Sequence, residues 1–233
     1  MRADELRAWS VHGLTALGPV LGFLALQEIG QRDWRAALLW LGAALVVDTV
    51  DGSLARRFRV QEVLPDYDGK MVDWVSDFLN FVFIPAVLLF EAGLVPGELR
   101  FACVLLVLFS AAYHFGNRRA VTEDLHFRGF PAFWNLVVYY LLILHLPAAW
   151  NAAVVLLFFV LHFVPVRFVY PTRAGRFRPL VVGLTVLWLI DTLLIVIAFP
   201  DASPWLVWLS LLFLGWMAAL GFASGLRRTP ELS

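Results

Sequence analysis

Long apolar segments make up most of the chain, separated by short connections that contain charge, proline or glycine. A helix needs about 20 mostly apolar residues to cross the hydrocarbon core of a bilayer. Eight segments come near this length, at residues 11–29, 34–55, 71–91, 99–117, 131–146, 150–170, 179–199 and 204–224. The pattern predicts an all-α, polytopic membrane helix bundle with about eight transmembrane helices, folded as a single integral membrane domain over residues 1–233.

Composition agrees with this class. Hydrophobic residues make up 61% of the 233 residues, charged residues make up 15%, and the mean hydropathy is +0.78, values that exclude an ordinary soluble domain. Cys103 is the single cysteine, so neither a disulfide nor a cysteine-rich metal site is expected. Arg2 and Arg7 precede the first apolar segment, which has no clear cleavage site, and we therefore expect this segment to be retained as a helix.

The basic residues divide unevenly between the two ends of the predicted helices. With eight spans and the N-terminus inside, 15 of the 18 Lys and Arg residues fall on one side of the membrane. The other three are Arg32, Arg35 and Arg100, on the opposite side. Because Lys and Arg concentrate in cytoplasmic loops, this distribution predicts that both termini are cytoplasmic.

Four aspartates interrupt the second and third apolar segments. At helical spacing, the second segment carries Asp48, Asp51, Gly52 and Ala55, and the third carries Gly69, Asp73 and Asp77. A carboxylate at the centre of a membrane helix costs about 2.5 to 3.5 kcal/mol on an insertion scale, so these side chains are not there for stability. The two segments place their acids at similar depths below the cytoplasmic surface, and we expect the acids to meet in a cavity open to the cytoplasm.

A group of carboxylates indicates a metal site. Oxygen ligands without thiolate or a nearby imidazole favour a hard divalent cation, Mg²⁺ or Mn²⁺. Four carboxylates are enough for two shared ions, the arrangement that stabilises the attacking and leaving oxygens of an in-line phosphoryl transfer. The small residues Gly52, Ala55 and Gly69 leave room beside the metals for a phosphate ligand.

The spacing of these residues resembles the signature of the CDP-alcohol phosphotransferases, membrane enzymes that join a CDP-activated group to an alcohol and release CMP. The matching positions are Asp48, Asp51, Gly52, Ala55, Arg56, Gly69, Asp73 and Asp77. Twelve residues separate Arg56 from Gly69, a longer spacing than in most of the family and similar to that of the bacterial phosphatidylcholine synthases. The resemblance covers a catalytic core at about residues 8–180. Two additional C-terminal helices, at about 179–224, match that subfamily only in number.

This resemblance implies a role for each matching residue. The metal ligands would be Asp48, Asp51, Asp73 and Asp77, around Mn²⁺ or Mg²⁺, with two ions expected. Asp77 would also act as the catalytic general base. The nucleotide would be bound by Asp48, Gly52, Ala55, Arg56 and Gly69.

The resemblance also implies the substrates and the location. CDP-diacylglycerol and choline would be the substrates, and CMP would be released. The protein would be integral to the bacterial inner membrane, in contact with membrane lipid, with its active site facing the cytoplasm. A homodimer is compatible with this interpretation, and no nucleic acid partner is expected.

Recognition of choline is harder to predict, because a quaternary ammonium donates no hydrogen bonds and is usually held by aromatic faces. Trp134, Tyr113 and Trp74 are candidates for choline contact near the cytoplasmic ends of their helices. Packing or an interfacial belt is the alternative role for each, since aromatic residues make up 15% of the chain. Arg118 and Arg119 are candidates for contact with lipid phosphate, with structural anchoring at the cytoplasmic surface as the alternative.

Other functions fit parts of the pattern. Intramembrane acids also occur in cation-coupled transporters, although those sites lie near the bilayer midplane rather than toward one face. Within the same enzyme family, the acceptor alcohol could instead be inositol phosphate, glycerol phosphate or serine. The histidines lack paired ligand spacing and are expected to pack against other side chains. For Asp191, in the middle of the seventh segment, contact with a neighbouring helix and contact with a second subunit are both open.

Overall fold

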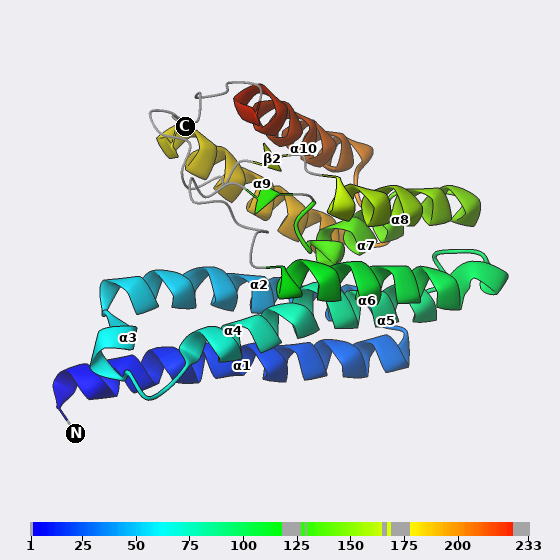
Figure 1. The fold of residues 1–233 in the computed structure, drawn as a ribbon. Helices are drawn as coiled ribbons and strands as arrows, with labels where there is room; N and C mark the ends of the chain where they lie inside the picture. Colours follow the sequence, from blue (N-terminus) through cyan, green and yellow to red (C-terminus); the bar gives the residue numbers. More distant parts are fainter. Residues whose placement is uncertain (1, 118–126, 129, 165–166, 169–177, 226–233) are drawn as a thin grey trace, which may run out of the picture.

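The computed structural model describes residues 2–117, 127–128, 130–164, 167–168 and 178–225, most of which are helical (Figure 1). The first half contains α1 (Ala3–Gln31), α2 (Trp34–Arg57), α3 (Val60–Val63), α4 (Gly69–Phe78), the π-helical turn η1 (Leu79–Phe83), α5 (Ile84–Glu91), the 3-10 turn η2 (Gly97–Leu99) and α6 (Arg100–Gly116). The second half contains β1 (Phe127–Arg128), α7 (Trp134–Ile143), α8 (Ala148–Phe163), β2 (Arg167–Phe168), α9 (Arg178–Ala198) and α10 (Pro204–Gly225).

The helices follow the eight predicted segments, with α4, η1 and α5 forming one continuous segment. Five are long and apolar enough to cross a membrane: Ala3–Gln31, Trp34–Arg57, Gly69–Glu91, Gly97–Gly116 and Pro179–Ala198. Three further apolar helices are shorter over the residues described: Trp134–Ile143, Ala148–Phe163 and Pro204–Ala219. The prediction of a polytopic, helical membrane protein is therefore confirmed. The short antiparallel pair of β1 with β2 was not predicted.

Two helices are shorter than their predicted segments. The helix expected at 150–170 ends at Phe163, because Val164 precedes a proline and takes an extended conformation. The helix expected at 131–146 covers only Trp134–Ile143. It ends two residues before His145, whose left-handed backbone (φ 48°) does not continue a right-handed helix.

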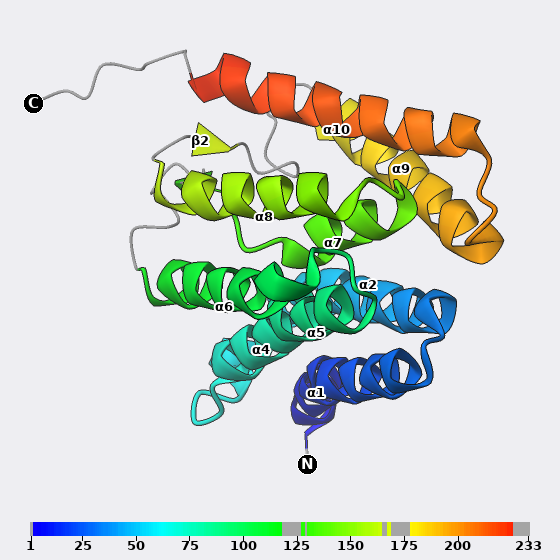
Figure 2. The same cartoon turned by 90° about the vertical axis from the view of Figure 1, so that its right-hand side faces the viewer.

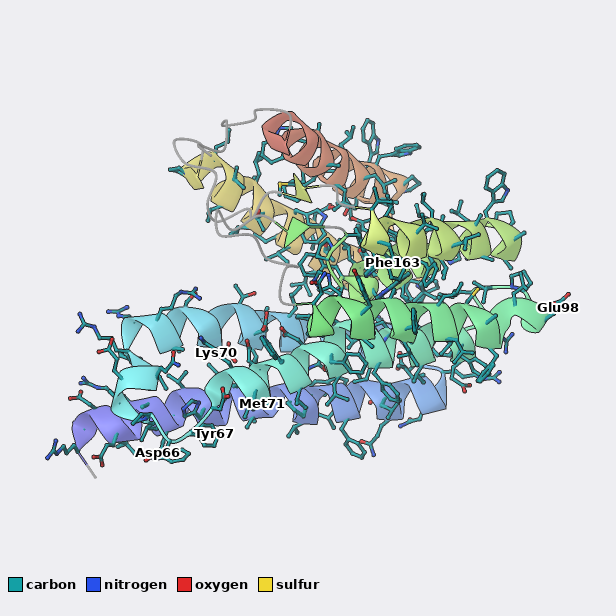
Figure 3. All side chains as sticks on the ribbon, viewed as in Figure 1. Asp66, Tyr67, Lys70, Met71, Glu98 and Phe163 are labelled. Carbon is teal, nitrogen blue, oxygen red and sulfur yellow. The ribbon has the colours of Figure 1, made fainter. Side chains whose placement is uncertain are left out.

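The helices form two layers. Figures 1 and 2 show α1, α2, α4 with α5, and α6 in one half of the molecule, and α8, α9 and α10 in the other. Within the first half α1 packs along α2 and α4, and within the second half α9 packs on α10. The packing of α6 on α8 joins the two halves. The turn of α3 joins α2 to α4 at the end that holds the N-terminus (Figure 1), whereas Glu98 lies at the opposite end of the bundle (Figure 3).

Two hydrophobic clusters stabilise this arrangement. The larger cluster joins the two halves and includes Val82, Leu89, Val107, Val138 and Val155. The smaller cluster lies at the N-terminal end and consists of the buried side chains Ala8, Val11 and Val60, with partly buried neighbours from the end of α2 and from α3. Burial of these apolar groups docks α3 on α1 and thereby sets where the next helix, α4, begins.

A hydrogen-bonded group connects α7, α9 and α10. The hydroxyls of Tyr140 and Ser210 bond to each other. The indole Nε1 of Trp188 donates to both, at 3.2 Å to Tyr140 Oη and 3.0 Å to Ser210 Oγ. Side-chain hydrogen bonds of this kind help membrane helices to associate, because lipid offers no competing partners.

We expect Tyr140→Phe to lower the free energy of unfolding by about 0.6 kcal/mol, the mean measured for hydrogen bonds between membrane helices, and by about 1.7 kcal/mol at most. Unfolding of the purified protein in detergent would measure the change. Tyr113→Phe is the matched control, because Tyr113 is 47% exposed on α6 and lies outside both hydrophobic clusters. Equal stability of the two variants would contradict a structural role for the Tyr140 hydroxyl.

Candidate active site

Carboxylates from α2 and α4 meet inside the half of the bundle that holds the N-terminus. One carboxylate oxygen from each of Asp48, Asp73 and Asp77 lies within 4.8 Å of the others. All three side chains are partly buried. Over the part of the chain that the structure describes, no other three His, Cys, Asp or Glu side chains form such a group.

Local sequence explains how α4 presents its acids. The helix begins at Gly69, just after Asp68, whose side chain accepts a hydrogen bond from the backbone N–H of Met71 at 3.1 Å. This is the usual role of an N-cap aspartate. Asp73 and Asp77 then follow one turn apart and lie on the same face of the helix.

Asp51 is placed differently from the other three acids. It is only 3% exposed and does not belong to the group of Asp48, Asp73 and Asp77. The polar groups next to its carboxylate are the Gly52 backbone N–H and the Thr15 hydroxyl of α1, which donates to the Val11 carbonyl at 3.2 Å. The structure therefore brings together three of the four predicted metal ligands and places the fourth beside α1.

Arg56 lies over Gly52 on α2. A methyl group added at Gly52 would be 3.5 Å from Arg56 Nη1. The guanidinium is exposed, and its Nη2 donates to Ser53 Oγ at 3.4 Å. Because Asp48, Gly52 and Arg56 follow at intervals of four residues, the guanidinium lies on the same helical face as Asp48. A positively charged donor in this place can bind a phosphate group beside the acids.

Two further predicted pocket residues face α1. Ala55 packs on the smaller hydrophobic cluster. A methyl group added at Gly69 would lie 2.5 Å from Cε1 and 2.9 Å from Nδ1 of His12, so only glycine fits there without a shift of the ring. The His12 ring also contacts Tyr67, with 4.3 Å between centroids. Tyr67 lies beside the end of α1 in Figure 3, and these contacts hold the connection before α4 against α1.

The three aromatic candidates for choline contact have different surroundings. Trp134 is fully buried, and its indole stacks on the imidazole of His162 with 5.4 Å between centroids. Trp74 is 54% exposed and lines an open apolar cavity with Phe78 and neighbouring residues. Tyr113 is also exposed and contacts Phe163. Arg118 and Arg119, the candidates for lipid phosphate, lie outside the described residues.

The donor set fits a hard divalent cation. Three carboxylates repel one another at this separation, and a cation between them would remove that repulsion. Oδ1 of Asp77 is buried and has no hydrogen-bond partner among the described residues, so it is free to act as a ligand. Carboxylate oxygens are the preferred protein ligands of Mg²⁺ and are also suited to Mn²⁺.

Sequence reasoning missed polar residues that support the site. Thr15 lies beside Asp51, and Ser76 and Asn80 are buried next to Asp77 along the chain. The signal was present, because polar side chains inside apolar spans are rare and usually have a role. Their contacts could not be assigned, since the sequence does not say which helix faces them.

Comparison with characterised proteins finds relatives along most of the chain. A phosphatidylcholine synthase of Pseudomonas aeruginosa is 37% identical over 223 residues, covering 96% of this chain and 91% of the relative. A phosphatidylcholine synthase of Mesorhizobium japonicum is 38% identical over 185 residues, with coverage of 79% and 69%. That of Bradyrhizobium diazoefficiens is 39% identical over 192 residues, with coverage of 82% and 72%. No family model matches the chain.

We expect Asp48→Asn and Asp73→Asn each to weaken Mn²⁺ binding at least tenfold, because each removes a charged ligand from the group of three. Electron paramagnetic resonance of free Mn²⁺ would measure binding to the purified protein. Without metal, both variants should unfold at or above the temperature of the unchanged protein, since a repulsion is lost. Asp66→Asn, on the exposed connection before α4, is the control. Unchanged Mn²⁺ affinity in both variants would show that the group does not bind metal.

Proposed function

The chain belongs to the bacterial phosphatidylcholine synthase family, and we propose that it is the enzyme that transfers a phosphatidyl group from CDP-diacylglycerol to choline. The products are phosphatidylcholine and CMP. The single observation that carries the proposal is the group of Asp48, Asp73 and Asp77 within membrane helices, since this fits metal-dependent phosphoryl transfer on a lipid. The acyl chains can stay in the bilayer while the diphosphate enters the site.

In this proposal two divalent ions, Mn²⁺ or Mg²⁺, are held by the four aspartates Asp48, Asp51, Asp73 and Asp77. When bound, the ions neutralise the diphosphate and the departing CMP. The close approach of three carboxylates and the unpartnered oxygen of Asp77 support this assignment. Asp51 of α2, which lies beside Thr15 and outside the group of three, is the proposed fourth ligand.

Asp77 is the proposed general base. The Asp77 carboxylate accepts the proton of the choline hydroxyl while the choline oxygen bonds to the phosphorus that carries diacylglycerol. The bond from this phosphorus to the bridging oxygen of the diphosphate breaks, and the bridging oxygen leaves with CMP. Asp77 then returns the proton to water.

The nucleotide pocket is proposed to lie along the face of α2 that carries Asp48. Gly52 leaves space there, and the Arg56 guanidinium above it is available for a phosphate of the nucleotide. Ala55 and Gly69 bound the same pocket where α2 and α4 pack on α1.

For choline we propose Trp134 as the first candidate and Tyr113 and Trp74 as further candidates. Trp134 is fully buried and stacked on His162, so choline would reach its indole only after these side chains move apart. Arg118 and Arg119 remain proposed contacts for the lipid phosphate.

We place the site and both termini on the cytoplasmic side of the inner membrane. Lys70, at the start of α4, lies at the end of the bundle that holds the N-terminus, whereas Glu98 lies at the other end (Figure 3). The predominance of basic residues at the first end supports this orientation. A homodimer is compatible with the proposal.

The acceptor is tested with a panel of alcohols. Purified protein with CDP-diacylglycerol and Mn²⁺ should release CMP with choline, and label from choline should appear in lipid. Serine, inositol phosphate and glycerol phosphate should give less than a tenth of this rate. A preference for one of these would support another member of the broader enzyme family, and metal-coupled choline uptake without lipid product would support a transporter.

We expect Asp77→Asn to fold and insert normally but to lose activity by about 10² to 10⁴-fold, because the amide cannot accept the choline proton. CMP release by the purified variant measures the loss, and its unfolding temperature confirms folding. Asp66→Asn should retain full activity. Substantial turnover in Asp77→Asn would place the general base elsewhere.

A further inference from the structure

Helix α4 packs unusually closely on α1 just below the acids. Gly18 and Gly22 lie one turn apart on α1 and face α4 and η1. A methyl group at Gly18 would overlap the Ser76 hydroxyl. A methyl group at Gly22 would overlap the side-chain oxygen of Asn80 and lie 2.7 Å from Ile84 Cδ1. Small residues at this spacing allow two membrane helices to approach with their backbones in close contact.

Asn80 connects the two helices at this contact. Its Nδ2 donates to the backbone carbonyl of Gly18 at 3.1 Å and to Ser76 Oγ at 3.3 Å. The side chain is 3% exposed. Because the Gly18 carbonyl can only accept, the amide nitrogen must face α1, and the orientation of the amide is determined. The bond to Gly18 fixes where the turn around Asn80 lies along α1. It also fixes how this turn is rotated about its own helix axis.

Asn80 also lies where the helix changes its winding. It is the second residue of η1, and Asp77 is two residues before η1 begins. A π-turn adds one residue to the helical repeat, which turns the following helix by about 100° relative to an unbroken α-helix. As a result α5 can pack on α7 in the main core, while α4 keeps the orientation that its contact with α1 imposes. The contact with α1 therefore sets the direction in which α4 presents Asp73 and Asp77.

We propose that Asn80 is a positioning residue for the acid group: its bond to Gly18, seated against Gly22, holds α4 so that Asp73 and Asp77 face Asp48 of α2. A turn of α4 by one residue would carry both acids away from α2. The consequence for catalysis rests on the proposed function, whereas the consequence for metal binding does not.

The chain offers a matched control for this residue. Asn151 is 2% exposed, its Nδ2 donates to the backbone carbonyl of Leu94 at 2.7 Å, and its Oδ1, like that of Asn80, has no hydrogen-bond partner among the described residues. Leu94 lies between α5 and η2, and Asn151 lies in the first turn of α8. Glu98 of η2 marks the end of the bundle opposite the N-terminus (Figure 3). Asn80→Leu and Asn151→Leu thus remove the same kind of bond and differ in distance from the site.

We expect Asn80→Leu to raise the Mn²⁺ dissociation constant at least tenfold, measured by electron paramagnetic resonance. It should lower kcat by about 100-fold, as expected for a displacement near 1 Å, with the KM for choline within about threefold. Asn151→Leu should lose comparable thermal stability but change neither Mn²⁺ affinity nor kcat by more than about twofold. Equal effects of the two substitutions, or unchanged Mn²⁺ affinity in Asn80→Leu, would overturn the proposal.

A second pair of variants tests the same contact from α1. Gly22→Ala should displace Asn80 and weaken Mn²⁺ binding, whereas Gly13→Ala, on the same helix with nothing within 4 Å of the added methyl, should not. Equal Mn²⁺ affinity in these two variants would overturn the inference, as would failure of both Asn80→Leu and Gly22→Ala to fold. If the unchanged protein binds Mn²⁺ but makes no phosphatidylcholine, the proposed function fails and the metal measurements still decide the role of Asn80.

Discussion

Negatively charged side chains held close together are the constraint on which this structure depends. Three carboxylate oxygens lie within 4.8 Å of one another, and any two of them that are both charged repel by about 4 kcal/mol at 4 Å and an effective dielectric constant near 20. This repulsion opposes the contact of α2 with α4 unless a cation or a proton removes it. Their common neighbour, α1, packs along both helices and keeps them together. The acid group therefore depends on a helix that contributes none of its three members.

The buried face of α1 explains how this helix can pack against both α2 and α4. Seven buried residues recur at alternating intervals of three and four, with His12 beside them, and they are small or polar as well as apolar: Ala8, Val11, Thr15, Gly18, Gly22, Ala25 and Ile29. Such a repeat forms the seam of helices that pack nearly parallel. Three of these positions meet different parts of the site and its supports. His12 meets the start of α4, Thr15 meets Asp51, and Gly18 meets Asn80.

The C-terminal half has its own buried polar residues. Asp191 is 5% exposed, lies near Tyr139 of α7, and has no hydrogen-bond partner for either oxygen in the described ranges. Its burial within the bundle favours contact with a neighbouring helix over contact with a second subunit. Together with the bonds among Tyr140, Trp188 and Ser210, it places polar side chains at the contacts of α7, α9 and α10. These helices are thus built into the bundle by polar contacts as well as by apolar packing.

The sequence alone determined the class of the protein, the positions of its apolar helices and the two segments that carry the acids. These features depend on segment length, hydropathy and the helical repeat, which can be read from the order of residues within one segment. The ends at Phe163 and Ile143 were less predictable, because apolar residues continue beyond the point where the backbone leaves the helix. Only the tertiary structure decided that Asp48, Asp73 and Asp77 meet while Asp51 turns to Thr15, and that Gly69 is needed opposite His12. Such relations depend on the rotation of one helix about its axis against another, and that rotation is set by contacts between residues far apart in the chain.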